Sequence, residues 1–306
     1  MSLAPAPPSA PVEPTRPLIE VRDLVKRYGD KTVLSGVDLE VYRGETLVVI
    51  GGSGSGKTTL ARLIMGLEKP TSGRIFLKGV EMTALDSQAL ISLRARFAMV
   101  FQKSALLDSM SVLDNVAFPL REQTALDEPT IRERVLLKLR ALGIEDAANK
   151  LPGQLSGGMA KRAAIARAMI TEPEILVYDE PTSGLDPVSS RMVDELIEQM
   201  RDRFFVTSIV ISHDMVTAFQ IADRLALLSR GTIVTSGPPA EVLRSHSAEV
   251  ERFAASSGID LDEIARPATR KSPSEIGALW EASRPAGEHE EKSWWRRRQG
   301  DCAVLL

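Results

Sequence analysis

The sequence predicts an α/β fold built on a parallel β-sheet, and three observations support this prediction. Short apolar runs, typical of buried strands, alternate with helical patterns along much of the chain. The first segment, from residue 18 to about residue 85, is rich in strand patterns, whereas the residues from about 86 to 168 form a mostly helical insertion. With 306 residues, the chain is long enough to bury one large or two modest hydrophobic cores.

The first segment contains a series of predicted strands. Leu18–Leu24 alternates between apolar and polar residues, and Val33–Val41 follows as a second strand after a short link. Thr46–Ile50 is an almost uninterrupted apolar run, as expected for a strand that is buried on both faces. After a turn that begins at Pro70, Gly73–Leu77 is predicted to be a further strand.

Apolar residues recur at helical spacing in the insertion. One stripe is made of Ile131, Val135, Leu139 and Leu142. Ala160–Ile170 is a further predicted helix. Beyond the insertion, the predicted strands Glu174–Asp179 and Phe205–Ile211 lie on either side of a helix from about Pro187 to Arg203, with Asp186 as its N-cap. This alternation of strands and helices predicts the parallel sheet.

The bulk composition excludes several classes of protein. A net charge of −3 gives no general electrostatic attraction to nucleic acid. The single cysteine, Cys302, excludes an internal disulfide and a cysteine metal site, and it suggests a free thiol in a reducing compartment. No stretch approaches the roughly 18 apolar residues of a membrane span, so any span must come from another chain. Residues 1–17 are rich in Ala and Pro, lack signal-peptide features and are predicted to be a disordered tail.

A phosphate-binding motif follows the third predicted strand. Residues 51–59 match the pattern G-x-x-x-x-G-K-[ST] and lie between a strand and the helical pattern Leu60–Met65, which is the context this motif requires. Glycines let the backbone curl around phosphates, and the helix N-terminus faces the anion. We expect Lys57 to reach the β- and γ-phosphates and Thr58 to ligate Mg²⁺. The expected phosphate-binding residues are Gly51, Gly52, Ser53, Gly54, Ser55, Gly56, Lys57, Thr58 and Thr59.

Two carboxylates end a predicted strand farther along the chain. The apolar run Ile175–Tyr178 leads directly into Asp179 and Glu180. Such a position faces the ligand crevice of an open α/β sheet, where Asp179 can hold Mg²⁺ and Glu180 can polarise an attacking water. A strand that simply ends in an acidic turn is the alternative, and the phosphate-binding motif favours the catalytic interpretation.

A second anion-binding motif opens a helix in the insertion. The segment Leu155-Ser-Gly-Gly-Met159 precedes the predicted helix at Ala160. Together with the motifs above, it resembles the signature LSGGQ of the nucleotide-binding subunits of ATP-binding cassette (ABC) transporters. The resemblance covers about residues 18–243 and implies a P-loop NTPase core with an N-terminal antiparallel β subdomain and an inserted helical subdomain at about residues 86–168.

Further site residues follow from this resemblance. Tyr28 matches the aromatic residue that stacks on adenine, and Gln102 matches the loop glutamine that meets Mg²⁺ and transmits motion to the membrane partner. His213 matches the histidine that contacts the γ-phosphate, and Ser183–Asp186 resembles the dimer-communication loop. Without the family, His213 would be taken as a capped strand end and Gln102 as a surface amide.

The resemblance also implies a mechanism. Two copies of the chain sandwich two ATP molecules with Mg²⁺, and each site pairs the P-loop of one copy with Ser156, Gly157 and Gly158 of the other. ATP closes the dimer, and hydrolysis reopens it. The implied catalytic residues are Glu180, His213, Gln102 and Lys57, and the implied metal-binding residues are Thr58, Gln102 and Asp179.

Three departures from the family average resemble the ATPases of the maintenance-of-lipid-asymmetry (Mla) type. They are Met159 in place of the signature glutamine, the Ala-rich segment Ala160–Arg167 and the segment from Lys103 to Glu122. The resemblance implies a peripheral protein on the cytoplasmic face of the bacterial inner membrane, bound to a permease dimer and, through it, to an Mce-domain protein. The implied cargo is phospholipid or a related lipid. Generic drift within the subfamily is the alternative for these three features.

Other functions remain as alternatives. The ATPase can instead drive conformational work, as in lipoprotein release or cell division, or serve the transport of another substrate. A nucleic-acid or ribosome-associated cassette ATPase is disfavoured, because the chain has one cassette and no basic bias.

Residues 244–306 are predicted to be a C-terminal extension. Ala248–Ser256 has a helical pattern, and the stretch from Ala248 to Asp260 is long enough to reach across to a second subunit. Beyond Arg266 the sequence is rich in Pro, Ser and charge, and we expect it to be mobile. Trp294–Arg298 is either a contact with an anionic membrane surface or part of a solvated tail.

Overall fold

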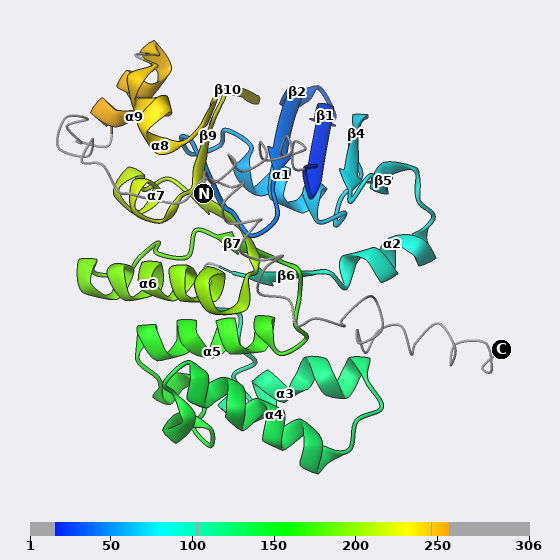
Figure 1. Ribbon diagram of the computed structural model, residues 1–306, viewed down its shortest axis with the longest axis vertical. Helices are drawn as coiled ribbons and strands as arrows, with labels where there is room; N and C mark the ends of the chain where they lie inside the picture. Colours follow the sequence, from blue (N-terminus) through cyan, green and yellow to red (C-terminus); the bar gives the residue numbers. More distant parts are fainter. Residues whose placement is uncertain (1–15, 102–103, 246, 257–306) are drawn as a thin grey trace, which may run out of the picture.

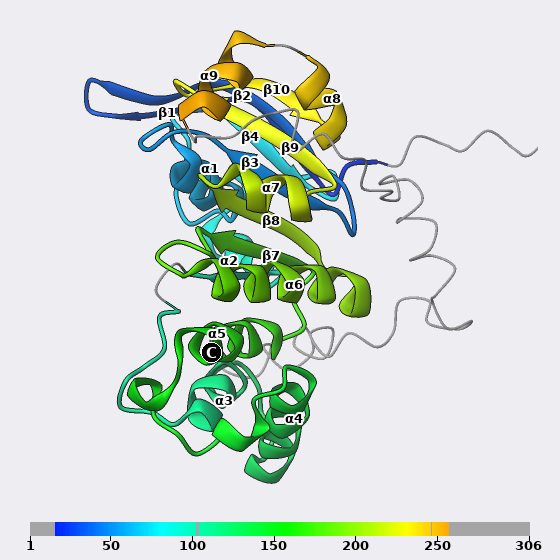
Figure 2. The ribbon, with the colours of Figure 1, turned by 90° about the vertical axis from the view of Figure 1, so that its left-hand side faces the viewer.

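The computed structural model describes residues 16–101, 104–245 and 247–256. Within these residues the strands form two sheets, and the helices lie around and below them (Figures 1 and 2). The smaller sheet has the order β2-β1-β4-β5, and the larger has the order β10-β9-β3-β8-β7-β6. The predicted α/β class is therefore confirmed.

The larger sheet holds the parallel strands. Its members are β3 (Thr46–Ile50), β6 (Phe97–Val100), β7 (Ile175–Asp179), β8 (Thr207–Ser212), β9 (Arg224–Ser229) and β10 (Thr232–Gly237). β3 pairs in parallel with both β8 and β9, whereas β10 runs antiparallel to β9 at the edge. Every residue of β3 and β8 is buried, which explains why neither strand alternates between apolar and charged residues.

The smaller sheet is antiparallel. It contains β1 (Ile19–Tyr28), β2 (Lys31–Val41), β4 (Ser72–Leu77) and β5 (Val80–Glu81). β1 runs farther than predicted, so that Tyr28 is its last residue and lies next to the hairpin turn into β2. Hydrogen bonds join the two sheets: the Ser35 amide donates to the Gly231 carbonyl, with an N–O distance of 2.8 Å, and the Arg224 guanidinium of β9 donates to the Glu40 carbonyl of β2 at 3.0 Å. At Gly231 (φ 82°) a Cβ would meet the Val33 carbonyl oxygen at 2.6 Å, so this close approach requires glycine.

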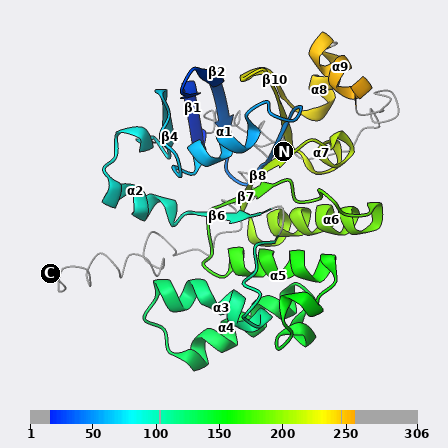
Figure 3. The same ribbon diagram turned by 180° about the vertical axis from the view of Figure 1, so that it is seen from behind.

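The helices cover the sheets and build a separate helical unit. They are α1 (Lys57–Ile64), α2 (Ser87–Arg94), α3 (Val112–Gln123), α4 (Glu128–Ala141), α5 (Gly157–Met169), α6 (Pro187–Phe204), α7 (Met215–Ile221), α8 (Pro239–Arg244) and α9 (Ala248–Ser256), with short 3₁₀ turns at Met82–Ala84, Glu145–Ala147 and Pro152–Gln154. Figures 1 and 3 show α5 between α6 and the pair α3 and α4. α6 begins directly after the predicted N-cap, Asp186. The Asp186 carboxylate accepts hydrogen bonds from the amides of Val188 and Ser189.

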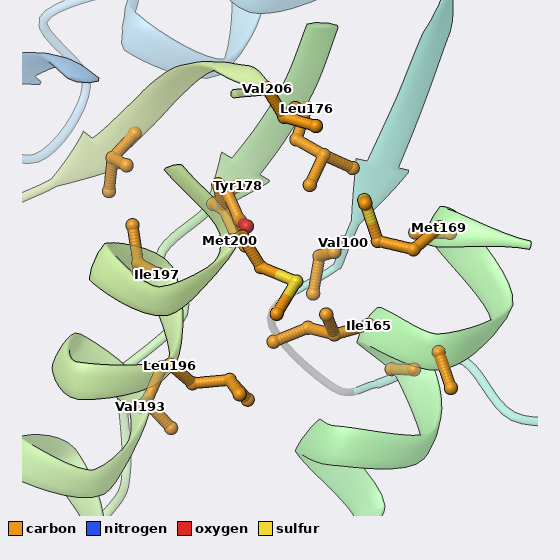
Figure 4. Close-up of a cluster of buried hydrophobic side chains, with 14 of the residues drawn as sticks. Val100, Ile165, Met169, Leu176, Tyr178, Val193, Leu196, Ile197, Met200 and Val206 are labelled. Carbon is orange, nitrogen blue, oxygen red and sulfur yellow. The ribbon is translucent and has the colours of Figure 1, made fainter. Parts of the chain in front are cut away.

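Buried side chains join the helical unit to the larger sheet. The cluster in Figure 4 includes Val100, Leu176 and Tyr178 from the strands, Ile165 and Met169 from α5, and Val193, Leu196, Ile197 and Met200 from α6. A continuous core of this kind transmits displacement between its elements, because protein interiors are close-packed. The position of α5 is therefore coupled to the strands that carry the site.

Some elements differ from the sequence predictions. The helix-rich stretch from residue 86 contains β6, which pairs with β7 and forms an edge of the larger sheet. Its four residues are too short a run to produce a strand pattern. β9 and β10 were not predicted either. Within the described residues, no helix is long and apolar enough to span a membrane. The predictions for Trp294–Arg298 and Cys302 lie outside the described part of the chain.

Candidate active site

The P-loop joins β3 to α1, and its glycines meet geometric demands. Gly56 is the N-cap of α1 with φ 106°, a left-handed conformation that other residues rarely adopt. At Gly51 a Cβ would lie 2.2 Å from the Leu228 carbonyl oxygen. Gly52, Ser53 and Gly54 are exposed, so their backbone faces outward at the start of the helix. The loop therefore has the shape of an anion-binding site.

Lys57 is drawn into this loop. Its side-chain nitrogen donates hydrogen bonds to the carbonyl oxygens of Gly51, at 2.9 Å, and Gly52, at 3.0 Å. Burial lowers the pKa of Lys57, while the nearby carboxylates of Glu180 and Asp179 act in the opposite direction. A cation thus lies beneath the exposed loop and faces two carboxylates from another strand.

Thr58 and Asp179 bring two oxygen atoms together. The Thr58 hydroxyl donates to Asp179 Oδ1 at 3.1 Å. Burial raises the pKa of Asp179, and the hydrogen bond from Thr58 partly offsets this effect. Within the described residues, no group of three or more His, Cys, Asp or Glu side chains is arranged to hold a metal ion. A hydroxyl and one carboxylate suit Mg²⁺, which keeps waters and takes substrate phosphates as its remaining ligands.

Glu180 and His213 meet at the ends of neighbouring strands. His213 Nδ1 lies 3.4 Å from Glu180 Oε1. Glu180 has φ 48°, a left-handed conformation, and its amide donates to the Ile211 carbonyl of β8 at 2.9 Å. Such a backbone is unfavourable for a residue with a side chain and is typical of functional sites. The turn after β7 thereby aims a carboxylate toward the imidazole after β8.

Tyr28 lies beside the P-loop at the end of β1. Its hydroxyl donates to the Glu68 carboxylate, which raises the pKa of the hydroxyl, while the nearby side chain of Thr59, the last residue of the P-loop motif, acts in the opposite direction. Tyr28 is 46% exposed. The sequence did not single out Glu68, because a partner 40 residues away in the chain leaves no local pattern.

The signature segment lies in the helical unit, apart from these groups (Figures 1 and 2). Ser156 is the N-cap of α5, and its hydroxyl accepts a hydrogen bond from the Met159 amide at 3.3 Å. Gly157 and Gly158 form the first turn of this helix. The structure therefore gathers Lys57, Thr58, Asp179, Glu180 and His213 into one site and leaves Ser156, Gly157 and Gly158 at a second helix N-terminus. The predicted residue Gln102 lies outside the described residues.

Comparisons with known proteins agree with this geometry. The ABC transporter family model matches residues 34–183. The chain is 40% identical over 236 residues to the intermembrane phospholipid transport system ATP-binding protein MlaF of Haemophilus influenzae, covering 77% of this chain and 89% of that protein. It is also 40% identical over 256 residues to the chloroplastic protein TRIGALACTOSYLDIACYLGLYCEROL 3 of Arabidopsis thaliana, with 78% and 74% covered. The probable ribonucleotide transport ATP-binding protein mkl of Mycobacterium leprae is 35% identical over 273 residues, with 89% and 79% covered.

Solved structures lead to the same family. The dimeric structure of MJ0796, a bacterial ABC transporter cassette, matches with a TM-score of 0.65 and 31% identity over 72% of this chain and 98% of that one. A post-hydrolysis state of MJ0796, bound to ADP and Pi, matches equally well, with a TM-score of 0.65 and 30% identity over the same shares of the two chains. A phosphate-binding loop, an adjacent pair of carboxylates and a signature helix thus occur on a fold shared with ATP-hydrolysing cassettes. The chain belongs to the ABC transporter family, and it is an ATP-binding, ATP-hydrolysing protein of the Mla type.

Proposed function

We propose that this chain forms an ATP-sandwich dimer that powers a membrane permease for phospholipid or a related lipid. The observation that carries the proposal is the division of the site. The groups suited to phosphate and its metal gather at the strand ends, whereas the second anion-binding segment caps α5 in the helical unit. Two copies in head-to-tail arrangement complete both sites, as the dimeric form of the matching MJ0796 cassette supports.

In this proposal, the chain's own residues position the nucleotide for hydrolysis. The adenine stacks on Tyr28, and the triphosphate lies over residues 51–59, where Lys57 balances its charge. Thr58 and Asp179 would hold Mg²⁺, which would supply positive charge next to the phosphates. Glu180 orients the attacking water and accepts its proton, and His213 holds the Glu180 carboxylate and contacts the γ-phosphate. Gln102 would provide a further Mg²⁺ contact, as the family resemblance implies.

The lipid assignment rests on the relatives and on the departures of this sequence from the cassette average. MlaF is named for intermembrane phospholipid transport, and it matches over 89% of its own length. Met159, the segment Ala160–Arg167 and the segment from Lys103 to Glu122 are the departures that resemble the Mla type. We infer a peripheral protein on the cytoplasmic face of the inner membrane, bound to a permease dimer and through it to an Mce-domain protein.

Purification of the full chain from gently solubilised native membranes tests the proposal. Recovery of a permease, an Mce-domain protein and phospholipid supports lipid transport. The recovered complex, reconstituted into donor vesicles with labelled phospholipid, is expected to move lipid only with ATP, and its Glu180→Gln variant is expected to move none. A different membrane partner would reassign the cargo. The mkl relative, named for ribonucleotide transport, makes nucleotide uptake the first alternative to assay. A lipoprotein-release or cell-division partner would point instead to conformational work.

A further inference from the structure

The hydroxyl end of Tyr28 is fixed by a carboxylate. Its phenol donates a hydrogen bond to Glu68 Oε2, four residues beyond the end of α1. Tyr28, Lys26 and Arg62 together hold the pKa of Glu68 below its usual range, so that the group is a carboxylate at neutral pH. A hydrogen bond to an ionised acceptor is stronger than a neutral one, and it defines the direction of the phenol.

Glu68 itself is held from two sides. Lys26 Nζ lies 3.3 Å from Glu68 Oε2, and Arg62 Nη1 of α1 lies 3.5 Å from Glu68 Oε1. The backbone around it is anchored as well, because the Thr71 amide donates to the Val25 carbonyl of β1 at 2.8 Å. The carboxylate therefore has a fixed position relative to both α1 and β1.

One face of the Tyr28 ring is already covered. Lys26 Nζ lies 4.7 Å from the ring centroid, and it also donates to the Lys69 carbonyl at 2.8 Å, which keeps the ammonium in place. A planar base can stack only on the opposite face. The ring is thus fixed at its hydroxyl end and covered on one side before any ligand arrives.

We infer that Glu68 is a positioning residue that presets Tyr28 as the platform for the adenine of ATP. This inference rests on the proposed role of Tyr28. A half-exposed ring that is ordered in advance loses less conformational freedom on binding than a free one. Immobilising one such side chain accounts for a change of roughly 3- to 10-fold in affinity. Loss of this positioning is expected to weaken the binding of the adenine and to leave the binding of the phosphates unchanged.

Steady-state ATPase kinetics of the full-length chain test the inference. Glu68→Leu, which cannot accept the hydrogen bond, is expected to raise KM for ATP roughly 3- to 10-fold with kcat retained. Tyr28→Phe, which keeps the ring and removes the donor, is expected to give the same increase, and the double variant is expected to add nothing. Glu68→Gln, whose amide oxygen still accepts, is expected to restore most of the affinity.

Inorganic tripolyphosphate separates the base from the phosphates. Its inhibition constant as a competitor of ATP is expected to be unchanged in Glu68→Leu. The matched control is a second tyrosine–glutamate pair at the end of β2, in which the Tyr42 hydroxyl donates to Glu40 Oε2 at 2.6 Å. Tyr42→Phe is expected to leave KM unchanged.

Three outcomes would overturn the inference. An unchanged KM in Glu68→Leu, together with a raised KM in Tyr28→Ala, would show that Tyr28 contacts adenine without being positioned by Glu68. An unchanged KM in Tyr28→Ala would also remove the proposed role of Tyr28. Equal weakening of tripolyphosphate and ATP binding in Glu68→Leu would show that Glu68 acts on the P-loop through α1.

Discussion

The two ends of the larger sheet both hold buried charge, and they arrange it in opposite ways. At the amino ends of the strands, Glu45 is paired with Arg224 at 3.1 Å and Asp223 with Arg201 at 3.1 Å. Both carboxylates also accept backbone amides, those of Tyr42 and Thr46. Both carboxylates therefore have a cationic partner within the chain, although the buried Glu45 Oε2 accepts no hydrogen bond.

The carboxyl ends of the same strands leave their charges directed toward a ligand. Lys57 contacts backbone carbonyls, and Asp179 and Glu180 face it from β7. Removing one partner of an internally paired buried charge destabilises the fold, whereas charge held against a loop of exposed amides is available to phosphate and metal. Substitutions at the carboxyl ends of the strands should therefore lower activity, whereas substitutions at the amino ends should lower folding stability.

The largest expected effect belongs to Glu180. Glu180→Gln removes the proton acceptor and keeps the shape of the side chain, so we expect ATP turnover to fall about 10²- to 10⁴-fold with ATP binding retained. Phosphate release and nucleotide affinity measure the two quantities. Glu145→Gln, at a glutamate paired with Arg140 in the helical unit, is the control. Near-normal hydrolysis by Glu180→Gln would refute the catalytic assignment.

A substitution at the amino ends of the strands should lower the folding stability. Arg224→Met removes the partner of the fully buried Glu45, and we expect a loss of about 3 kcal/mol in the free energy of unfolding. This is at the low end for a broken buried pair, because Glu45 can take up a proton. Urea denaturation measures the change. A stability equal to that of the parent chain would show that the pair is not structural.

Lys57→Ala tests the ligand-facing end without touching catalytic carboxylates. Loss of the cation should weaken ATP binding by about 10- to 100-fold, since one charge-assisted contact to phosphate contributes roughly 1.5–3 kcal/mol. Calorimetric titration with ATP measures it, and urea denaturation should show little change. Unchanged affinity would contradict the phosphate-binding role of Lys57.

The smallest expected effect is a pH dependence of stability. Burial raises the pKa of Glu45 to about 7, from an unfolded value of 4.5. Between these values the folded state binds the proton more strongly, so stability is greatest at low pH and falls as pH rises, with a limiting slope of about 1.4 kcal/mol per pH unit. Asp194, whose pKa burial also raises to about 7, adds to the same slope.

Glu45→Gln should flatten this slope in part, and the double variant with Asp194→Asn should flatten it further. Chemical denaturation at pH 5 and pH 8 checks both. Glu40→Gln, an exposed glutamate on β2, is the control and should keep the full slope. An unaltered slope in the double variant would show that these two carboxyls do not set the pH response.

Motif chemistry explains which parts of the site were predictable. The P-loop and the Asp179–Glu180 pair follow from residues that are adjacent in sequence, because phosphate and metal require a fixed local arrangement. The strand β3 was predictable because its burial on both faces makes every residue apolar or small. The pair of Glu45 and Arg224, by contrast, joins residues 179 apart, and only the sheet register brings them together.

Short elements were the least predictable part of the fold. β6 has four residues, and its pairing with β7 places a strand inside a stretch that otherwise has helical patterns. The Tyr28–Glu68 contact depends in the same way on how the segment after α1 folds back onto β1. Side-chain partners of this kind are products of tertiary packing and leave no spacing to detect.

The hydrogen bond between Ser35 and Gly231 gives the molecule a mechanical property. Together with the tight packing of Gly56 against Leu34, it locks the hairpin that ends near Tyr28 to the frame of the P-loop. The adenine and the phosphates of a bound nucleotide would then contact a single rigid unit. The buried cluster of β6, α5 and α6 packs against the strands that carry this frame, so we expect displacements during the ATP cycle to pass through it to the helical unit.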